Sequence, residues 1–265
     1  MATEENLDDS KAPLIEHLVE LRTRLIRSVI AIMVMFVVCF FFADEIFNIL
    51  VVPLEKAAGE LREMKLIFTS PQEYFFSQLK IGLFGALFLA FPVIASQIYL
   101  FMAPGLYRHE RAAFYPFLIA TPILFALGAC LVYFLIMPLA MGFFLGFEQT
   151  GDDGRVAIEL LPRVSEYLGL IMTLIFAFGF VFQLPVVLTL MARVNLIGSD
   201  TLTTKRKYAV VIAFAMAAIL TPPDPISQIG LALPTLVLYE ISIYCVKLVE
   251  RQRERNMLDD EAEDA

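Results

Sequence analysis

The sequence has few charged residues, and only two histidines and three cysteines among its 265 residues. Charged residues make up 18% and apolar residues 59%, whereas soluble domains have about 25% charged and about 45–50% apolar residues. This composition excludes a disordered chain and an ordinary water-soluble domain. Whole segments are apolar on every side, which indicates that their solvent is lipid. The sequence therefore predicts an all-α, polytopic membrane protein.

The histidines and cysteines are too scattered to build a catalytic or metal centre. Cys39, Cys130 and Cys245 lie in separate apolar stretches, and His17 is far from His109. The sequence contains no glycine-rich phosphate loop, no His-Glu-x-x-His motif and no Ser/His/Asp set. The net charge of −8, with acids and bases segregated, also argues against nucleic-acid binding. We therefore expect no catalytic residue, no metal, no cofactor and no nucleic-acid partner.

Six apolar segments approach the length of a membrane-spanning helix, which needs roughly 20 residues to cross about 30 Å of hydrocarbon. Residues 112–147 are uncharged and too long for one crossing, so Pro138 and Gly142 are expected to release the chain into an interfacial segment. Three prolines within residues 221–225 shorten the last two crossings, for which a re-entrant hairpin is the alternative. The predicted crossings are Leu25–Ala43, Phe75–Ile98, Phe114–Met137, Tyr167–Ala192, Tyr208–Leu220 and Ile226–Val246.

The distribution of basic residues predicts that both termini are cytoplasmic. Fourteen lysines and arginines lie on the terminal side of the six crossings and five on the opposite side, and cytoplasmic loops carry the excess. The first crossing lacks a small-residue cleavage site, so we expect it to remain as an anchor. The predicted parts are a cytoplasmic N-terminal segment with an amphipathic helix (1–24), a six-span membrane domain (25–246) and a charged, disordered cytoplasmic tail (247–265).

Two segments at the cytoplasmic edge carry carboxylates among unusual neighbours. Residues 15–24 repeat leucine at helical spacing, and Glu20 lies one turn before Arg24, as in a simple i,i+4 ion pair. Residues 101–111 contain a Pro-Gly turn followed by Glu110 between two arginines, as at a solvated helix start. From the residues alone, a structural role and a binding role both stay open.

Several short motifs occur in order along the chain. They are His17-Leu18-x-Glu20-Leu21-Arg22-x-Arg24, Phe101-x-Ala103-Pro104-Gly105-Leu106-Tyr107-Arg108-His109-Glu110, Phe178-Gly179-x-x-Phe182-Gln183-Leu184-Pro185 and Leu220-Thr221-Pro222-Pro223-Asp224-x-x-Ser227-Gln228. Together with Pro53 after the first crossing, they closely resemble the TatC family, the multi-span component of the twin-arginine protein translocase. The resemblance covers roughly residues 13–246.

The resemblance implies a receptor and core scaffold in the bacterial cytoplasmic (inner) membrane, and not an enzyme. TatC proteins bind twin-arginine signal peptides of folded cargo proteins at the cytoplasmic face. They assemble with single-span TatA- and TatB-type partners into a multimeric complex that uses the proton-motive force. A secondary transporter of small solutes is the alternative, although it would need charged or broken helices meeting at the membrane midplane. An intramembrane enzyme would need a buried carboxylate or nucleophile–base pair, which the six predicted crossings lack.

The resemblance also implies which residues bind the signal peptide. Two guanidinium groups need carboxylate acceptors, and bidentate Arg–carboxylate pairing gives a specificity that lysine cannot copy. The family assigns this role to the positions of Glu20 and Glu110, and Phe101 matches a position needed for recognition. Supporting positions are Arg22, Pro53, Pro104, Leu106 and Tyr107.

Two further polar residues have competing interpretations. Gln183 lies within the fourth crossing, at a position that is frequently Glu in the family and faces the single-span partners. Its amide could instead hold two helices together, and its neutrality departs from the Glu form. Asp224 lies in the last outward loop, where a helix-capping role competes with a functional one.

Overall fold

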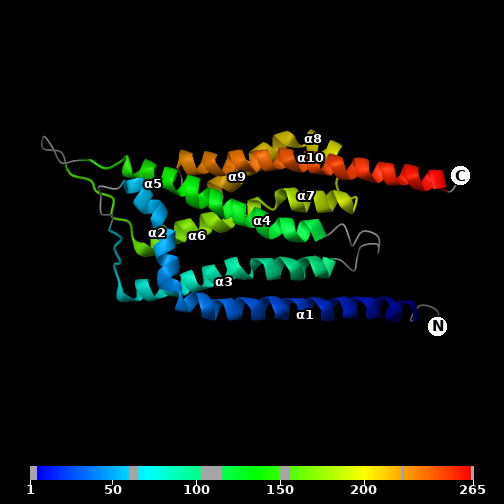
Figure 1. Ribbon diagram of the computed structural model, residues 1–265, viewed down its shortest axis with the longest axis horizontal. Coiled ribbons are helices and arrows are strands. Elements are labelled where there is room, and N and C mark those ends of the chain that lie inside the picture. The colour runs from blue at the N-terminus through cyan, green and yellow to red at the C-terminus, as the bar shows by residue number, and fades with distance from the viewer. Residues whose placement is uncertain (1–4, 60–64, 103–114, 150–155, 222–223, 264–265) are drawn as a thin grey trace. The chain divides into compact units, whose positions relative to one another are not determined.

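The computed structural model describes residues 5–59, 65–102, 115–149, 156–221 and 224–263 (Figure 1). These residues form helices and contain no β-strand, only the isolated bridges Ile67–Arg163 and Gln149–Ile158. The all-α prediction is confirmed. In chain order the elements are α1 Glu5–Phe41, α2 Ala43–Ala58, α3 Pro71–Met102, α4 Tyr115–Leu131, the π-helix η3 Val132–Ile136, α5 Met137–Leu145, α6 Val164–Val181, α7 Leu184–Arg193, α8 Ser199–Thr204, α9 Arg206–Leu220 and α10 Pro225–Glu263.

Five helical stretches of the described chain are long and apolar enough to cross a bilayer. The fifth predicted crossing, Tyr208–Leu220, is not among them: it corresponds to α9, which has only 15 residues because the prolines after Leu220 end it. The polytopic prediction is therefore confirmed. The five stretches are His17–Phe41, Pro71–Phe101, Pro116–Leu145, Val164–Arg193 and Pro225–Arg255.

Both ends of the chain are more continuously helical than the sequence analysis expects. The N-terminal segment is not a separate helix, because α1 runs unbroken from Glu5 to Phe41. The last helix is not short, and α10 continues through the segment expected to be disordered, for 39 residues in all. Beyond Pro234 that helix contains no Gly or Pro and is rich in strong helix formers, so nothing in its sequence stops it.

The third crossing also differs from the prediction, because the chain does not leave the helix at Pro138. The helix passes from α4 through the π-turn Val132–Ile136 into α5, and the Met137 N–H donates to the Val132 carbonyl, five residues back. A proline lacks the N–H that continues an α-helix and clashes with a preceding carbonyl. The wider π-turn accommodates Pro138 at the start of α5, so the helix continues to Leu145.

The described residues fall into two compact units, one within 1–46 and 78–122 and one within 47–77 and 123–265. In the first unit α1 approaches α3 closely at a glycine. A Cβ atom on Gly85 would lie 2.9 Å from the Cys39 sulfur and 3.1 Å from the Ile46 Cδ1 atom. Small residues permit such close helix packing in membranes, where burial of apolar surface does not drive association.

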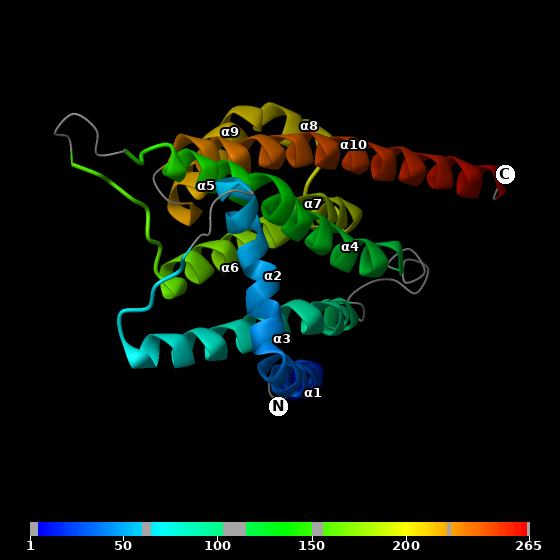
Figure 2. The same ribbon diagram turned by 60° about the vertical axis from the view of Figure 1, so that its left-hand side comes forward.

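The second unit has a tighter contact, between α4 and α6. A Cβ atom on Gly128 would lie 2.7 Å from the Phe178 carbonyl oxygen, and one on Gly179 would lie 2.5 Å from the ring of Phe125. Both phenylalanines are fully buried. In the same unit α9 and α10 lie side by side, as Figures 1 and 2 show. This packed unit holds Pro53, Gln183 and Asp224, whereas Glu20, Arg22 and Phe101 belong to the first unit.

Candidate functional site

The first unit brings the end of α3 against the N-terminal half of α1. The rings of His17 and Phe101 stack with their centroids 4.3 Å apart and their planes at 21°. Glu20 follows His17 by one helical turn, so it lies on the same side of α1. The structure therefore places Phe101 beside the helical turn that carries Glu20, although 81 positions separate the two residues in the sequence.

The Glu20 carboxylate has one described partner, within its own helix. The Arg24 Nη2 atom donates to Glu20 Oε1 at 3.1 Å, and the two side chains are 28% (Glu20) and 22% (Arg24) exposed. An i,i+4 pair of this kind contributes only about 0.3–0.5 kcal/mol. An ionised carboxylate offers about four acceptor positions, so this contact leaves Glu20 able to accept a further donor. Arg22, two residues away, is exposed on α1.

The second predicted carboxylate cannot be placed beside the first. Glu110, Pro104, Leu106 and Tyr107 all lie outside the described residues. Within the part of the chain that the structure describes, no group of three or more His, Cys, Asp or Glu side chains could hold a metal ion. The described half of the predicted site therefore consists of Glu20, Arg22 and Phe101.

Pro53 lies inside α2 and is buried, so it is not a loop residue. A proline at this position cannot donate to the carbonyl of Ile49, four residues back. The hydroxyl of Tyr133 donates to that carbonyl at 2.8 Å instead, and the buried Tyr167 hydroxyl donates to the neighbouring Leu50 carbonyl at 2.7 Å. Pro53 therefore has a packing role: it leaves the Ile49 carbonyl without a donor from its own helix, so that carbonyl can accept from Tyr133 of η3. The neighbouring Leu50 carbonyl accepts from Tyr167 of α6.

Gln183 lies at a break in the fourth crossing, between the end of α6 and the start of α7. Its backbone N–H donates to the Phe180 carbonyl at 3.0 Å, its own carbonyl accepts from Val187 at 2.9 Å, and the residue is 9% exposed. Pro185 then occupies the second position of α7. The break therefore sets a polar amide side chain at a bend in a mostly apolar crossing.

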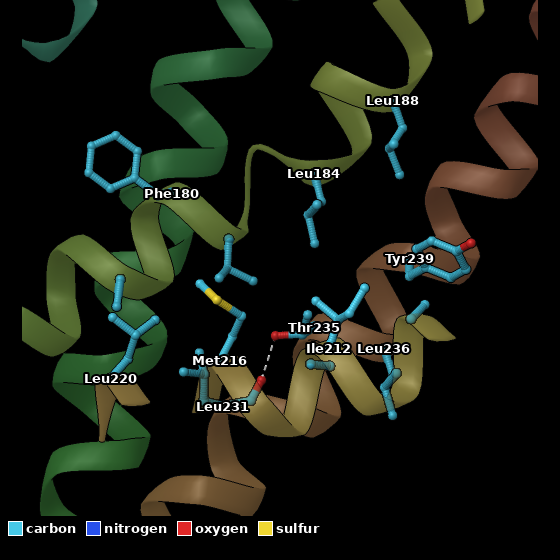
Figure 3. Close-up of a pocket in the computed structure, with 14 residues that line it drawn as sticks. Phe180, Leu184, Leu188, Ile212, Met216, Leu220, Leu231, Thr235, Leu236 and Tyr239 are labelled. Carbon is cyan, nitrogen blue, oxygen red and sulfur yellow. Dashed lines mark hydrogen bonds between the residues drawn. The ribbon is translucent and has the colours of Figure 1, made fainter. Parts of the chain in front are cut away.

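A cavity of about 600 Å³ lies next to this bend, in the same unit (Figure 3). Val181 and Leu184 line it from either side of the break, and α9 and α10 supply the opposite wall. The sequence motifs contain Leu184 and Leu220 but do not reveal this cavity, because its lining residues come from four helices and most of them look like ordinary lipid-facing positions.

Asp224 has the capping role that the sequence analysis left open. Its Oδ1 atom accepts from the Ser227 backbone N–H at 2.7 Å, and its carbonyl accepts from the Gln228 N–H at 3.2 Å. Pro225 follows as the first residue of α10, as is common at helix starts. Asp224 is 2% exposed, so its described contacts are those of a buried N-cap.

Comparison with known proteins places this fold among protein-transport components. The model of the TatC family, described as Sec-independent protein translocase protein, matches residues 16–234. The chain is 48% identical over 259 residues to the Sec-independent protein translocase protein TatC of Magnetococcus marinus, covering 97% of this chain and 93% of the relative. It is 37% identical over 232 residues to the protein of the same description from Escherichia coli (strain K12), covering 88% of this chain and 87% of the relative.

A solved structure agrees with these relatives. The crystal structure of the twin arginine translocase receptor TatC is 40% identical in sequence and superposes with a TM-score of 0.74. The match covers 88% of this chain and 99% of that chain.

Proposed function

The chain belongs to the TatC family of Sec-independent protein translocase proteins, and we propose that it is the receptor that binds twin-arginine signal peptides. The family consists of components of a protein transport system, so this is a transport role rather than a catalytic one. In this proposal the protein spans the bacterial inner membrane with both termini in the cytoplasm, which the excess of basic residues on the terminal side supports.

The contact between His17 and Phe101 carries the proposal. It sets an aromatic side chain from the end of α3 against α1, one turn from the Glu20 carboxylate. A signal peptide with an arginine pair followed by an apolar stretch needs both kinds of group. The carboxylate accepts from a guanidinium, and the aromatic ring packs against apolar or guanidinium surface.

The ion pair between Glu20 and Arg24 is weak, so Glu20 can exchange Arg24 for an arginine of the signal peptide. Its bond to Arg24 is part-exposed and contributes about 0.3–0.5 kcal/mol. A bidentate guanidinium from a bound peptide forms two charge-assisted hydrogen bonds, which are roughly twice as strong as neutral ones. The incoming arginine therefore displaces Arg24 at little cost. A lysine ammonium lacks the planar fork, so it gains less from the same exchange.

Binding of a fluorescent signal peptide to the full chain in nanodiscs tests this role of Glu20. The Glu20→Gln variant should lose at least about tenfold in affinity for the Arg-Arg peptide, while its already weak affinity for a Lys-Lys peptide changes little. Glu254→Gln, at an exposed position of α10, is the matched control and should bind as the unmodified protein does. Equal losses for the two peptides would contradict the proposal.

The variant Arg24→Gln gives the opposite expectation. Removing the internal competitor should strengthen Arg-Arg peptide binding by about twofold, which corresponds to the free energy of an i,i+4 pair. A loss of binding in this variant would mean that the ion pair itself shapes the site.

We assign the second acceptor to Glu110, with Pro104, Leu106 and Tyr107 shaping the loop around it. Charge reversal in the Glu110→Arg variant should abolish crosslinking of a twin-arginine precursor and leave membrane insertion intact. If crosslinking persists in this variant and in Glu20→Arg, neither carboxylate is an acceptor.

We assign Gln183 to the docking of single-span TatA- and TatB-type partners, in a complex driven by the proton-motive force. The amide lies at the break between α6 and α7, where it offers both a donor and an acceptor to a polar residue of a neighbouring helix. Gln183→Ala should weaken partner crosslinks, and Gln183→Glu should retain them. Unchanged crosslinks and export in Gln183→Ala would return Gln183 to a contact within the bundle.

A further inference from the structure

The cavity between α6, α7, α9 and α10 has the chemistry and dimensions of a lipid site (Figure 3). We propose that it binds one acyl chain of an anionic phospholipid from the surrounding bilayer, with the phosphate of the headgroup at Lys205 and Lys207. This inference concerns a different part of the molecule from the signal-peptide site and does not depend on it.

The lining of the cavity offers hydrocarbon and almost no hydrogen bonding. Thr235 and Tyr239 are its only residues with hydroxyl groups, and both hydroxyls are used within the protein. The Thr235 hydroxyl donates to the Leu231 carbonyl at 2.7 Å, drawn as the dashed line in Figure 3, and the Tyr239 hydroxyl donates to the Leu202 carbonyl at 2.8 Å. An occupant with polar groups would leave those groups unpaired at a cost of several kcal/mol, so the cavity favours an alkyl chain.

The length of the cavity matches that of an acyl chain. Along α9 the lining extends from Ala209 to Leu220, which is about 16 Å of helix at 1.5 Å per residue. One leaflet of the hydrocarbon core is about 15 Å deep. The cavity therefore runs for about the depth that one acyl chain occupies in its leaflet.

One end of the cavity lies next to the basic residues at the start of α9. Leu188 and Tyr239, which line it, also pack against the apolar cluster formed by Ala192, Leu202, Ile243 and Val246. Beyond this cluster the chain exposes three consecutive basic residues, Lys205, Arg206 and Lys207, before α9 reaches the cavity at Ala209.

The charges of this basic segment are complementary to an anionic headgroup. Arg206 is paired with Glu240, with 2.7 Å between Nη2 and Oε2, so its charge is compensated. The Lys207 ammonium lies 5.2 Å from the centre of the Tyr208 ring, and Lys205 is exposed. Two ammonium groups remain to attract a phosphate, and basic residues near the membrane surface favour anionic lipids in this way.

The chain contains no tryptophan, so one introduced tryptophan is the only source of tryptophan fluorescence in the protein. In the Phe180→Trp variant of the full chain, reconstituted in vesicles, quenching by brominated phosphatidylglycerol should indicate an apparent affinity at least about fivefold higher than for brominated phosphatidylcholine. Leu127→Trp, at an exposed position of α4 outside the cavity, is the control and should show no preference. Equal quenching of the Phe180→Trp variant by both lipids would overturn the proposal.

Two further variants, each made in the Phe180→Trp background, separate the headgroup from the acyl chain. Lys205→Gln/Lys207→Gln should remove the preference for phosphatidylglycerol, whereas Arg251→Gln/Arg253→Gln, at exposed positions of α10, should leave it unchanged. Ala209→Leu, which fills the cavity, should weaken quenching by both lipids. A preference that survives the lysine substitutions would overturn the headgroup assignment. If only an added single-span partner helix protects the introduced tryptophan, and lipid identity has no effect, the cavity binds protein and the proposal fails.

Discussion

The helix α1 and the broken helix formed by α6 and α7 are similarly apolar but differ in what surrounds them. Their mean hydropathies over the membrane-spanning stretches are both 2.3, yet 11% of the most apolar window is buried in α1 and 56% in α6–α7. In α1 large apolar side chains are exposed, among them Val29 (49%), Met33 (59%) and Val37 (53%). Hydrophobicity alone therefore does not distinguish a packing helix from a lipid-facing one.

The difference follows from lipid being the solvent. Lipid tails are as apolar as leucine, so exposing valine on α1 carries no hydrophobic penalty, and burying it gains little. Close packing must come from small residues and hydrogen bonds. The second unit has both. Its small residue is Gly128, which lies against the Phe178 backbone, and its hydrogen bonds run from Tyr133 and Tyr167 to α2. The weakly buried α1 is then suited to binding rather than to support.

The largest effect is expected at the α4–α6 contact. Gly128→Ala puts a methyl group where its Cβ would meet the Phe178 carbonyl oxygen at 2.7 Å, and a backbone atom cannot move aside alone. We expect a loss of about 2–3 kcal/mol in the free energy of unfolding in denaturing detergent. Gly169→Ala, with nothing within 4 Å, is the matched control on α6 and should be neutral or stabilising by up to about 1 kcal/mol. Equal losses would remove the contrast between packed and lipid-facing positions.

A smaller effect is expected at the N-cap of α10. Asp224→Ala removes the acceptor of the Ser227 N–H and should cost about 1–2 kcal/mol in the same assay. Asp224→Asn keeps an oxygen at that position and should lose only a few tenths of a kcal/mol. If the Asn variant is stable but no longer supports export, Asp224 has a role beyond the cap.

The bond from Tyr133 to α2 provides a test of cooperation within the packed unit. Tyr133→Phe removes the donor to the Ile49 carbonyl and should cost about 1 kcal/mol. In a Pro53→Ala background the new N–H of residue 53 can donate to the same carbonyl, so Tyr133→Phe should then have almost no effect. A double-mutant cycle measures this coupling, and simple additivity would show that Pro53 and Tyr133 do not share the Ile49 carbonyl.

The smallest effect is expected in the α1–α3 unit. Gly85→Ala places a methyl group against the Cys39 side chain, with 2.9 Å between the new Cβ and the sulfur. Because a side chain can shift, we expect a loss of about 0.5–1 kcal/mol. Adding Cys39→Ala should restore most of it. A loss as large as that of Gly128→Ala would show that α1 is held as firmly as α6.

The sequence predicts the crossings well, because runs of apolar residues directly meet the length that a bilayer demands. It also predicts the short α9, since three prolines in close succession, Pro222, Pro223 and Pro225, disrupt the hydrogen bonding of a continuing helix. It does not predict that the helix continues through Pro138, because this depends on the π-turn before it. The candidate site also has a part that the sequence predicts and a part that it does not. The motif positions of Glu20 and Phe101 are local in sequence, whereas the stack of His17 on Phe101 requires two helices to meet.

The length of α10 has a practical consequence for watching the protein at work. Its 39 residues correspond to about 58 Å, nearly twice the thickness of the hydrocarbon core. With the predicted crossing ending at Val246, the rest of α10 forms a stiff helix of about 25 Å beyond it. A fluorophore attached near its end would rotate with the embedded helices instead of wobbling on a flexible tether, so its polarisation would report tilting of the membrane core directly.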